Sequence, residues 1–139
     1  MNGNDSNRQF AAVVLAGDRS GSDPLVAASG RGCKALVDID GTPMILRVLA
    51  ALDQSATVGS ITICGPSSAS IATEGRLGRL IAEQRIAWQA PQATPSTSAW
   101  QALAATVPET PVLLTTADHP LLISKLTFRQ SATYIFDNG

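Results

Sequence analysis

The sequence predicts an α/β protein with three layers, α/β/α, and a mostly parallel central sheet. Strand-like and helix-like segments alternate along the chain, which favours right-handed crossovers between parallel strands. Residues 10–16 and 112–116 are apolar with little or no alternation, as strands covered on both faces are. A loop rich in glycine and small residues follows the first strand. Together these features predict one domain over residues 10–139.

Composition restricts the classes of partner. The 139 residues are 45% hydrophobic and 15% charged, which is typical of a globular chain that buries roughly two-thirds of its unfolded surface. The net charge is −1 and there is no basic run, so we expect no nucleic-acid partner. Two cysteines fit a reducing compartment. With no signal peptide and no run of 18 apolar residues, we expect a cytoplasmic protein with no membrane partner; the oligomeric state is left open.

The first part of the chain is predicted to contain two strands and a helix. Residues 1–9 are polar and are expected to form a disordered lead-in. The buried strand 10–16 is followed by a loop at 17–33, which is long enough to be functional. Residues 35–39 alternate and form a short strand or an extended edge. Thr42 then caps a helix over 43–52, with proline at its first position.

The middle of the chain repeats this alternation. Residues 60–64 form a strand that ends at a Gly-Pro pair. The polar segment 67–75 is expected to be a loop. The spacing of leucine and isoleucine predicts an amphipathic helix over 76–84, and residues 85–89 form the next strand.

The last part of the chain contains one further strand and helical segments. After a proline-bearing connection, Ser96 or Thr97 is expected to cap a helix that ends near residue 105. Residues 112–116 form a buried strand. A helix is expected to begin at Leu121, and the sequence ends shortly after the apolar residues 134–136.

One edge of this sheet is the expected ligand site. Ligands of open parallel sheets bind outside the carboxyl ends of the strands. The loops that follow residue 16, residue 89 and residue 116 should therefore lie along one edge.

The loop after the first strand has the chemistry of a polyphosphate site. An anionic polyphosphate needs several backbone N–H groups and side chains too small to hold the backbone away. Gly17, Ser20, Gly21 and Ser22 meet this demand. Lys34, at the end of the loop, adds a point charge on a flexible stem.

Two better-known phosphate motifs are absent. Cys33 precedes Lys34 and Ala35 follows it, so the pattern G-x-x-x-x-G-K-[ST] is not present. No G-x-G-x-x-G follows the first strand, which disfavours a dinucleotide site.

Asp118 is the candidate metal ligand. It comes directly after the strand 112–116, and a carboxylate there can hold Mg²⁺, which uses one or two carboxylates together with waters and substrate phosphates. The alternative is that Asp118 caps a following helix.

The remaining polar and aromatic candidates have weaker support. His119 is the sole histidine, so a histidine metal cluster is excluded, and we interpret it as a loop or supporting residue. Ser96, Thr97 and Ser98 offer hydroxyl and N–H groups to a base or ribose, or act as ordinary caps. Trp88 and Trp100 are expected to pack in the core or at its rim.

Four segments together carry a resemblance to a known family. They are Leu15-Ala16-Gly17, the glycine-serine loop, Lys34-Ala35-Leu36 and Gly41-Thr42-Pro43-Met44. This combination resembles the MobA-like NTP transferases, a nucleotidyltransferase family with a Rossmann-like fold of GT-A type. The resemblance covers residues 11 to about 122.

The resemblance implies transfer of a nucleoside monophosphate from an NTP to an anionic acceptor, a molybdopterin-type cofactor or a sugar phosphate, with release of pyrophosphate. It implies Lys34 and Asp118 as catalytic residues and Asp118 as the ligand of Mg²⁺. Catalysis would consist of positioning and electrostatics. The nucleotide-binding residues it implies are Leu15, Ala16, Gly17, Asp18, Arg19, Ser20, Gly21, Lys34, Ser96, Thr97 and Ser98.

The chain departs from the family pattern at two places. Asp18 stands where the family often has a second glycine, so Arg19 or Arg31 would have to supply the loop's positive charge. Family members also continue well beyond the first aspartate, so we expect a C-terminally truncated chain that holds the nucleotide-binding half. The alternatives are a non-catalytic nucleotide-binding or partner-binding module, or an inactive fragment of the enzyme.

Overall fold

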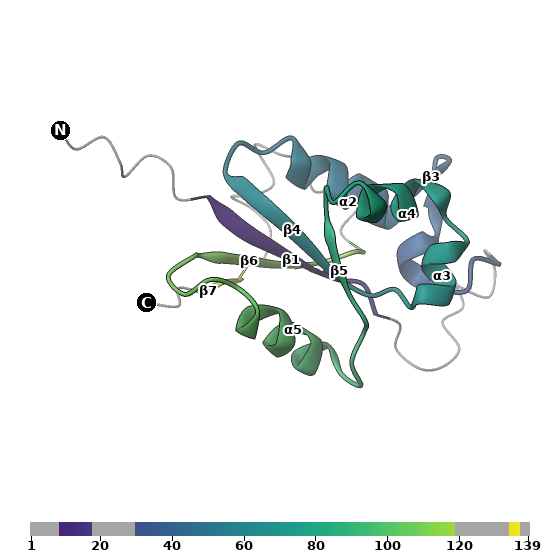
Figure 1. The fold of residues 1–139 in the computed structure, drawn as a ribbon. Coiled ribbons are helices and arrows are strands. Elements are labelled where there is room, and N and C mark those ends of the chain that lie inside the picture. Colours follow the sequence, from purple (N-terminus) through teal and green to yellow (C-terminus); the bar gives the residue numbers. More distant parts are fainter. Residues whose placement is uncertain (1–8, 18–29, 119–133, 137–139) are drawn as a thin grey trace.

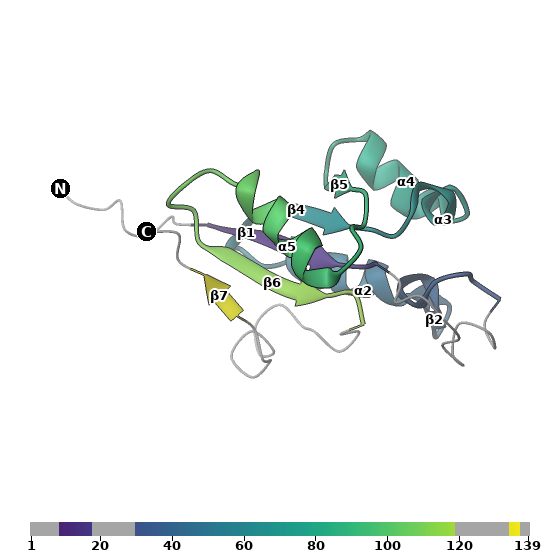
Figure 2. The same cartoon turned by 90° about the horizontal axis from the view of Figure 1, so that it is seen from below.

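The computed structural model describes residues 9–17, 30–118 and 134–136. Its main sheet has five strands in the order β5-β4-β1-β6-β7 (Figure 1). The first four are parallel, and β7 pairs antiparallel with β6 at the edge (Figure 2). The strands are β1 (Phe10–Leu15), β4 (Val58–Cys64), β5 (Ala87–Gln89), β6 (Val112–Thr116) and β7 (Tyr134–Phe136). The predicted mostly parallel α/β fold is therefore confirmed.

Helices cover both faces of this sheet. Those on one side are α2 (Met44–Asp53), α3 (Ser68–Ala72) and α4 (Gly75–Ala82), and α5 (Pro95–Ala104) lies on the other (Figure 1). The remaining elements are the short 3₁₀ helix η2 (Lys34–Leu36) and the antiparallel pair β2 (Asp38–Ile39) and β3 (Thr42–Pro43).

The central strand β1 is apolar because it contributes to two cores. Ala12 and Val14 pack in the cluster that includes Ile45 of α2. Ala11 and Val13 point to the opposite face and pack in the cluster that includes Ala102 of α5. Alternate residues of a strand face opposite sides of its sheet, so a strand buried on both faces has no polar position. This explains the unbroken apolar run in the sequence.

The carboxyl ends of the four parallel strands are aligned. Leu15 of β1 pairs with Cys64 of β4 on one side and with Thr116 of β6 on the other. Cys64 in turn pairs with Gln89 of β5. The loops that follow these strands therefore leave the sheet at one edge, as predicted; we call it the carboxyl edge.

The segment between the long loop and the first main helix differs from the prediction. Residues 34–36 form a 3₁₀ turn, so only 38–39 of the expected strand 35–39 pair as a strand. Thr42 belongs to β3, and Pro43 is the N-cap residue of α2 with no side-chain cap. The β2–β3 hairpin turns at Asp40 and Gly41, both with positive φ, and this tight pairing requires Thr42 and Pro43 to be extended.

Two other local predictions were wrong. The polar segment 67–75 is not a loop throughout, since Ser67 accepts a hydrogen bond from Ser70 N and begins α3. The cap of α5 is Thr94, and Pro95 occupies the first turn. A threonine followed by proline fits this role because proline lacks the N–H that the first turn leaves unused.

Some predictions fall on residues outside the described part of the chain. These are the disordered lead-in, apart from Gln9, and the helix from Leu121. Among the helices that the structure describes, none has the length and apolar character needed to cross a membrane.

Candidate functional site

Lys34 and Asp118 meet at the carboxyl edge. Lys34 opens η2, and Asp118 comes two residues after the end of β6. The Lys34 Nζ atom lies 3.2 Å from Asp118 Oδ2, and the two side chains are 44% and 43% exposed. Residues 84 positions apart are thus brought into an ion pair that solvent and a ligand can reach.

Thr116 holds the other oxygen of the same carboxylate. Its hydroxyl donates to Asp118 Oδ1 at 2.5 Å. This hydrogen bond, more than the nearby Lys34 ammonium, lowers the pKa of Asp118, against an opposing contribution from burial. The carboxylate is therefore ionised at neutral pH, and each of its oxygens has a donor.

The donor chemistry at this edge fits a magnesium ion. Mg²⁺ prefers oxygen ligands, and proteins commonly supply one or two carboxylates while phosphates and water complete the shell. Asp118 offers one ionised, half-exposed carboxylate. Within the described residues, no group of three or more His, Cys, Asp or Glu side chains gathers. Among the described residues, Asp118 is therefore the candidate protein ligand of a metal at this edge.

The Leu15-Ala16-Gly17 segment is packed closely by two neighbouring connections. A Cβ atom added at Gly17 would lie 3.2 Å from Pro91 Cβ in the β5–α5 connection. A Cβ atom at Gly65, which has φ +86°, would lie 2.9 Å from Gly17 N and 3.0 Å from Ala16 O. The start of the predicted phosphate loop, at Ala16 and Gly17, therefore lies against a position, Gly65, that has no room for a side chain.

We predict that Gly65→Ala destabilises the protein by about 2–4 kcal/mol, because a positive φ and a clash with fixed backbone add. Gly78→Ala is the matched control: a Cβ atom there meets nothing within 4 Å, and alanine in a helix interior is favourable by about 0.5–1 kcal/mol. Urea unfolding of both variants measures the difference. Equal stability of the two variants would contradict the proposed crowding at Gly65.

The start of α5 uses most of its hydroxyl groups for its own structure. Ser98 is buried, and its Oγ accepts a hydrogen bond from Gln92 N at 2.9 Å. Thr94 Oγ1 accepts from Thr97 N at 3.1 Å and lies 2.8 Å from Thr97 Oγ1. Ser96 is exposed in the first turn. Of the three predicted residues, Ser96 and Thr97 are exposed to solvent.

Arg31 and Glu74 belong to an ion-pair network that contacts η2, the turn that begins with Lys34. The Glu74 side chain is only 8% exposed, and its Oε2 lies 2.8 Å from a terminal nitrogen of Arg31. Its Oε1 lies 2.9 Å from Arg76 Nε. Arg31 also donates through Nε to Leu36 O at 2.8 Å. Arg31, Glu74 and Arg76 are named the arginine clasp below.

The hydrogen bond from Arg76, followed by that from Arg31, lowers the pKa of Glu74 from 4.5 to about 2 despite its burial. A carboxyl group whose pKa is lower in the folded state stabilises the fold at any pH above its unfolded-state pKa. That stabilisation is lost as the pH falls through the folded-state pKa. We therefore predict that stability falls by about 1–3 kcal/mol between about pH 5 and pH 2 through this group.

The check is urea unfolding of wild type and Glu74→Gln at pH 6 and pH 3. The variant should show a smaller loss between the two pH values than the wild type. Identical pH dependence in the two proteins would contradict the assigned role of Glu74.

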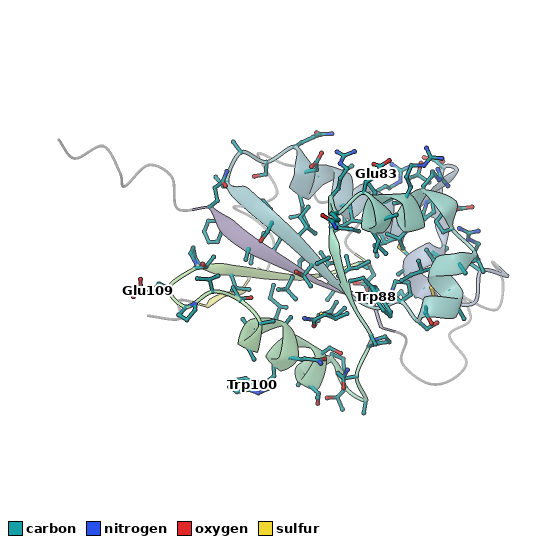
Figure 3. All side chains as sticks on the ribbon, in the orientation of Figure 1. Glu83, Trp88, Trp100 and Glu109 are labelled. Carbon is teal, nitrogen blue, oxygen red and sulfur yellow. The ribbon has the colours of Figure 1, made fainter. Side chains whose placement is uncertain are left out.

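The two tryptophans and Cys64 differ in how far they are buried. Trp88 is partly buried, and its Nε1 donates to Pro66 O at 2.9 Å, so its packing role is confirmed. Trp100 points outward from α5 (Figure 3) and is 73% exposed, so its predicted packing role was wrong. Burial raises the pKa of the Cys64 thiol, which disfavours the reactive thiolate form.

The described residues contain only part of the predicted site. The carboxyl edge carries Leu15, Ala16, Gly17, Lys34 and Asp118, and α5 begins with Ser96, Thr97 and Ser98. Asp18, Arg19, Ser20, Gly21 and Ser22, together with His119, lie outside the described residues.

Sequence reasoning missed Thr116, Gly65 and Glu74. The positions of Thr116, two residues before Asp118, and of Gly65, directly before Pro66, could have identified these two residues from the sequence. No sequence feature identified Glu74, which lay in a segment predicted to be a loop.

The family model for the MobA-like NTP transferase domain matches residues 12–133. This chain therefore belongs to the MobA-like NTP transferase family. A comparison with curated protein sequences finds no significant match.

Solved structures with the same fold include several transferases and synthases. A hypothetical transferase from Thermus thermophilus is 24% identical with a TM-score of 0.61; the match covers 89% of this chain and 48% of that one. 4-diphosphocytidyl-2C-methyl-D-erythritol synthase from Anaerococcus prevotii is 14% identical, with a TM-score of 0.60 and coverage of 87% and 48%. CMP:2-keto-3-deoxy-manno-octonic acid synthetase, complexed with CTP, is 15% identical, with a TM-score of 0.55 and coverage of 86% and 44%. The chain thus spans about half the length of these proteins.

Proposed function

We propose that this chain is the nucleotide-binding half of a nucleotidyltransferase. The reaction transfers a nucleoside monophosphate from an NTP to a small anionic acceptor and releases pyrophosphate. The observation that carries the proposal is the ion pair between Lys34 Nζ and Asp118 Oδ2 at the carboxyl edge. Membership of the MobA-like NTP transferase family supports it.

The reaction needs charge neutralisation more than covalent chemistry. An acceptor oxygen attacks the α-phosphorus, and the bond from that phosphorus to the bridging oxygen breaks as pyrophosphate leaves. Negative charge grows on the leaving group, and fixed cations near it lower the barrier. Lys34 places an ammonium at the end of the phosphate loop, where it can contact the phosphates once it exchanges Asp118 for them.

Asp118 is the proposed ligand of Mg²⁺. When bound, Mg²⁺ supplies Lewis acid stabilisation to phosphate oxygens. Thr116 keeps the Asp118 carboxylate in place through its hydrogen bond to Oδ1. The backbone of Gly17 and the loop after it is proposed to cradle the triphosphate, and Ser96 and Thr97 to meet the base or ribose.

The proposed acceptor is a sugar phosphate or a molybdopterin-type cofactor. Its support is membership of the family. A solved structure of this fold that is complexed with CTP supports an NTP as the donor.

A second candidate function is nucleotide binding without turnover. This function needs only the Lys34–Asp118 pair that the described residues form at the carboxyl edge.

Pyrophosphate release separates the two functions. The chain is incubated with MgCl₂, each of CTP, GTP, ATP and UTP, and either a sugar phosphate or molybdopterin. Release that requires both NTP and acceptor supports the transferase. NTP binding without release supports the second function, and absence of both would contradict the proposal.

A further inference from the structure

The arginine clasp lies beside the candidate site and has no role in the function proposed above. Glu74 is a buried carboxylate, and a buried charge is costly unless it is paired and hydrogen-bonded. Both of its oxygens are paired, one with Arg31 and one with Arg76. Arg76 is local, two residues away on α4, whereas Arg31 comes from the end of the phosphate loop, 43 residues earlier.

The second contact of Arg31 is a hydrogen bond to η2, the 3₁₀ turn that begins with Lys34. Its Nε donates to the carbonyl of Leu36, the last residue of η2. One planar guanidinium therefore bridges the start of α4 and the end of the turn in which Lys34 sits. The planar guanidinium of arginine can donate hydrogen bonds to two acceptors at fixed directions, whereas the lysine ammonium is a point charge on a flexible stem.

We propose that the arginine clasp positions Lys34 for phosphate binding, and that Arg31 acts through Lys34 without contacting the phosphates itself. This inference rests on the proposed function. The clasp fixes the backbone of η2 before the ligand arrives, which lowers the ordering cost of binding. It assigns Arg31 as a positioning residue where the sequence had suggested a phosphate ligand.

The experiment uses isothermal titration of the full chain with Mg²⁺ and the NTP that gives the largest thermal shift. Four proteins are compared: wild type, Glu74→Gln, Lys34→Ala and the double variant. Glu74→Gln should weaken binding by about three- to tenfold, as loss of a supporting contact does. On the Lys34→Ala background the same substitution should change binding by less than about twofold, because coupled residues are not additive.

Asp53→Asn is the matched control, since Asp53 pairs with Arg85 at 3.4 Å near the amino ends of β4 and β5. It should leave binding unchanged. If Glu74→Gln does not fold, as judged by its melting curve, Arg31→Lys takes its place. That variant keeps a charge beside Glu74 but loses the fork, and its loss of affinity should likewise vanish on the Lys34→Ala background.

The alternatives give different results. If Arg31 binds phosphate directly, Glu74→Gln releases it and affinity stays equal or rises, and any Arg31→Lys loss persists without Lys34; either result overturns the inference. A Glu74→Gln effect of the same size with and without Lys34 also overturns it. If the wild type binds no NTP, the proposed function fails and the inference fails with it.

Discussion

Replacing Asp118 by asparagine is expected to lower pyrophosphate release by about a hundredfold or more, the cost typical of losing one preorganised electrostatic group. Asparagine keeps the size of the side chain and can still accept the Thr116 hydrogen bond. It loses the charge that pairs with Lys34 and that would hold Mg²⁺. The measurement is the initial rate of pyrophosphate release at saturating NTP and MgCl₂.

The matched control for Asp118→Asn is Asp53→Asn, which removes an aspartate charge far from the carboxyl edge. The control should retain the wild-type rate and melting temperature. If Asp118→Asn also retains the wild-type rate, Asp118 is not part of the reacting site. If both variants lose activity to the same degree, the effect is one of general charge.

Replacing Lys34 by alanine is expected to weaken binding of Mg-NTP by more than about tenfold, a loss of about 1.4 kcal/mol or more. The substitution removes the ammonium that contacts Asp118 Oδ2 at 3.2 Å and that is proposed to contact the triphosphate. Isothermal titration of the NTP in the presence of MgCl₂ measures the change.

Arg85→Ala is the control for Lys34→Ala, because it removes one positive charge beside Asp53 instead of at the carboxyl edge. Its affinity should match that of the wild type. Unchanged affinity in Lys34→Ala would show that Lys34 does not bind the triphosphate. An equal loss in the two variants would point to net charge as the cause.

The sheet and its carboxyl edge were predictable from the sequence because their physics is simple. A strand buried on both faces has no polar position, and β1 shows this directly in its apolar run. Alternating elements then imply parallel pairing, and parallel strands end at one edge. Gly17 and Asp118 each follow one of these strands, so their common edge was predictable from the sequence alone.

The supporting contacts were not predictable because they join residues distant in sequence. The pairing of Arg31 with Glu74 joins residues 43 positions apart, and no local sequence pattern encodes that contact. Gly65 is constrained by the backbone of Ala16 and Gly17 across the sheet. The structure has a 3₁₀ turn at residues 34–36, where the first part of a strand over 35–39 was expected. An alternating run of five residues is too short to distinguish a strand from such a turn.

The most direct test of the account is the melting temperature of the chain with CTP, GTP, ATP or UTP, each with and without MgCl₂. A ligand that binds only the folded state stabilises it by about 2.7 kcal/mol at a hundred times its dissociation constant. We expect the melting temperature to rise by several degrees with at least one NTP, more with MgCl₂ than without, and by less in Lys34→Ala. No rise with any NTP at millimolar concentration would contradict the assignment of the carboxyl edge as a nucleotide site.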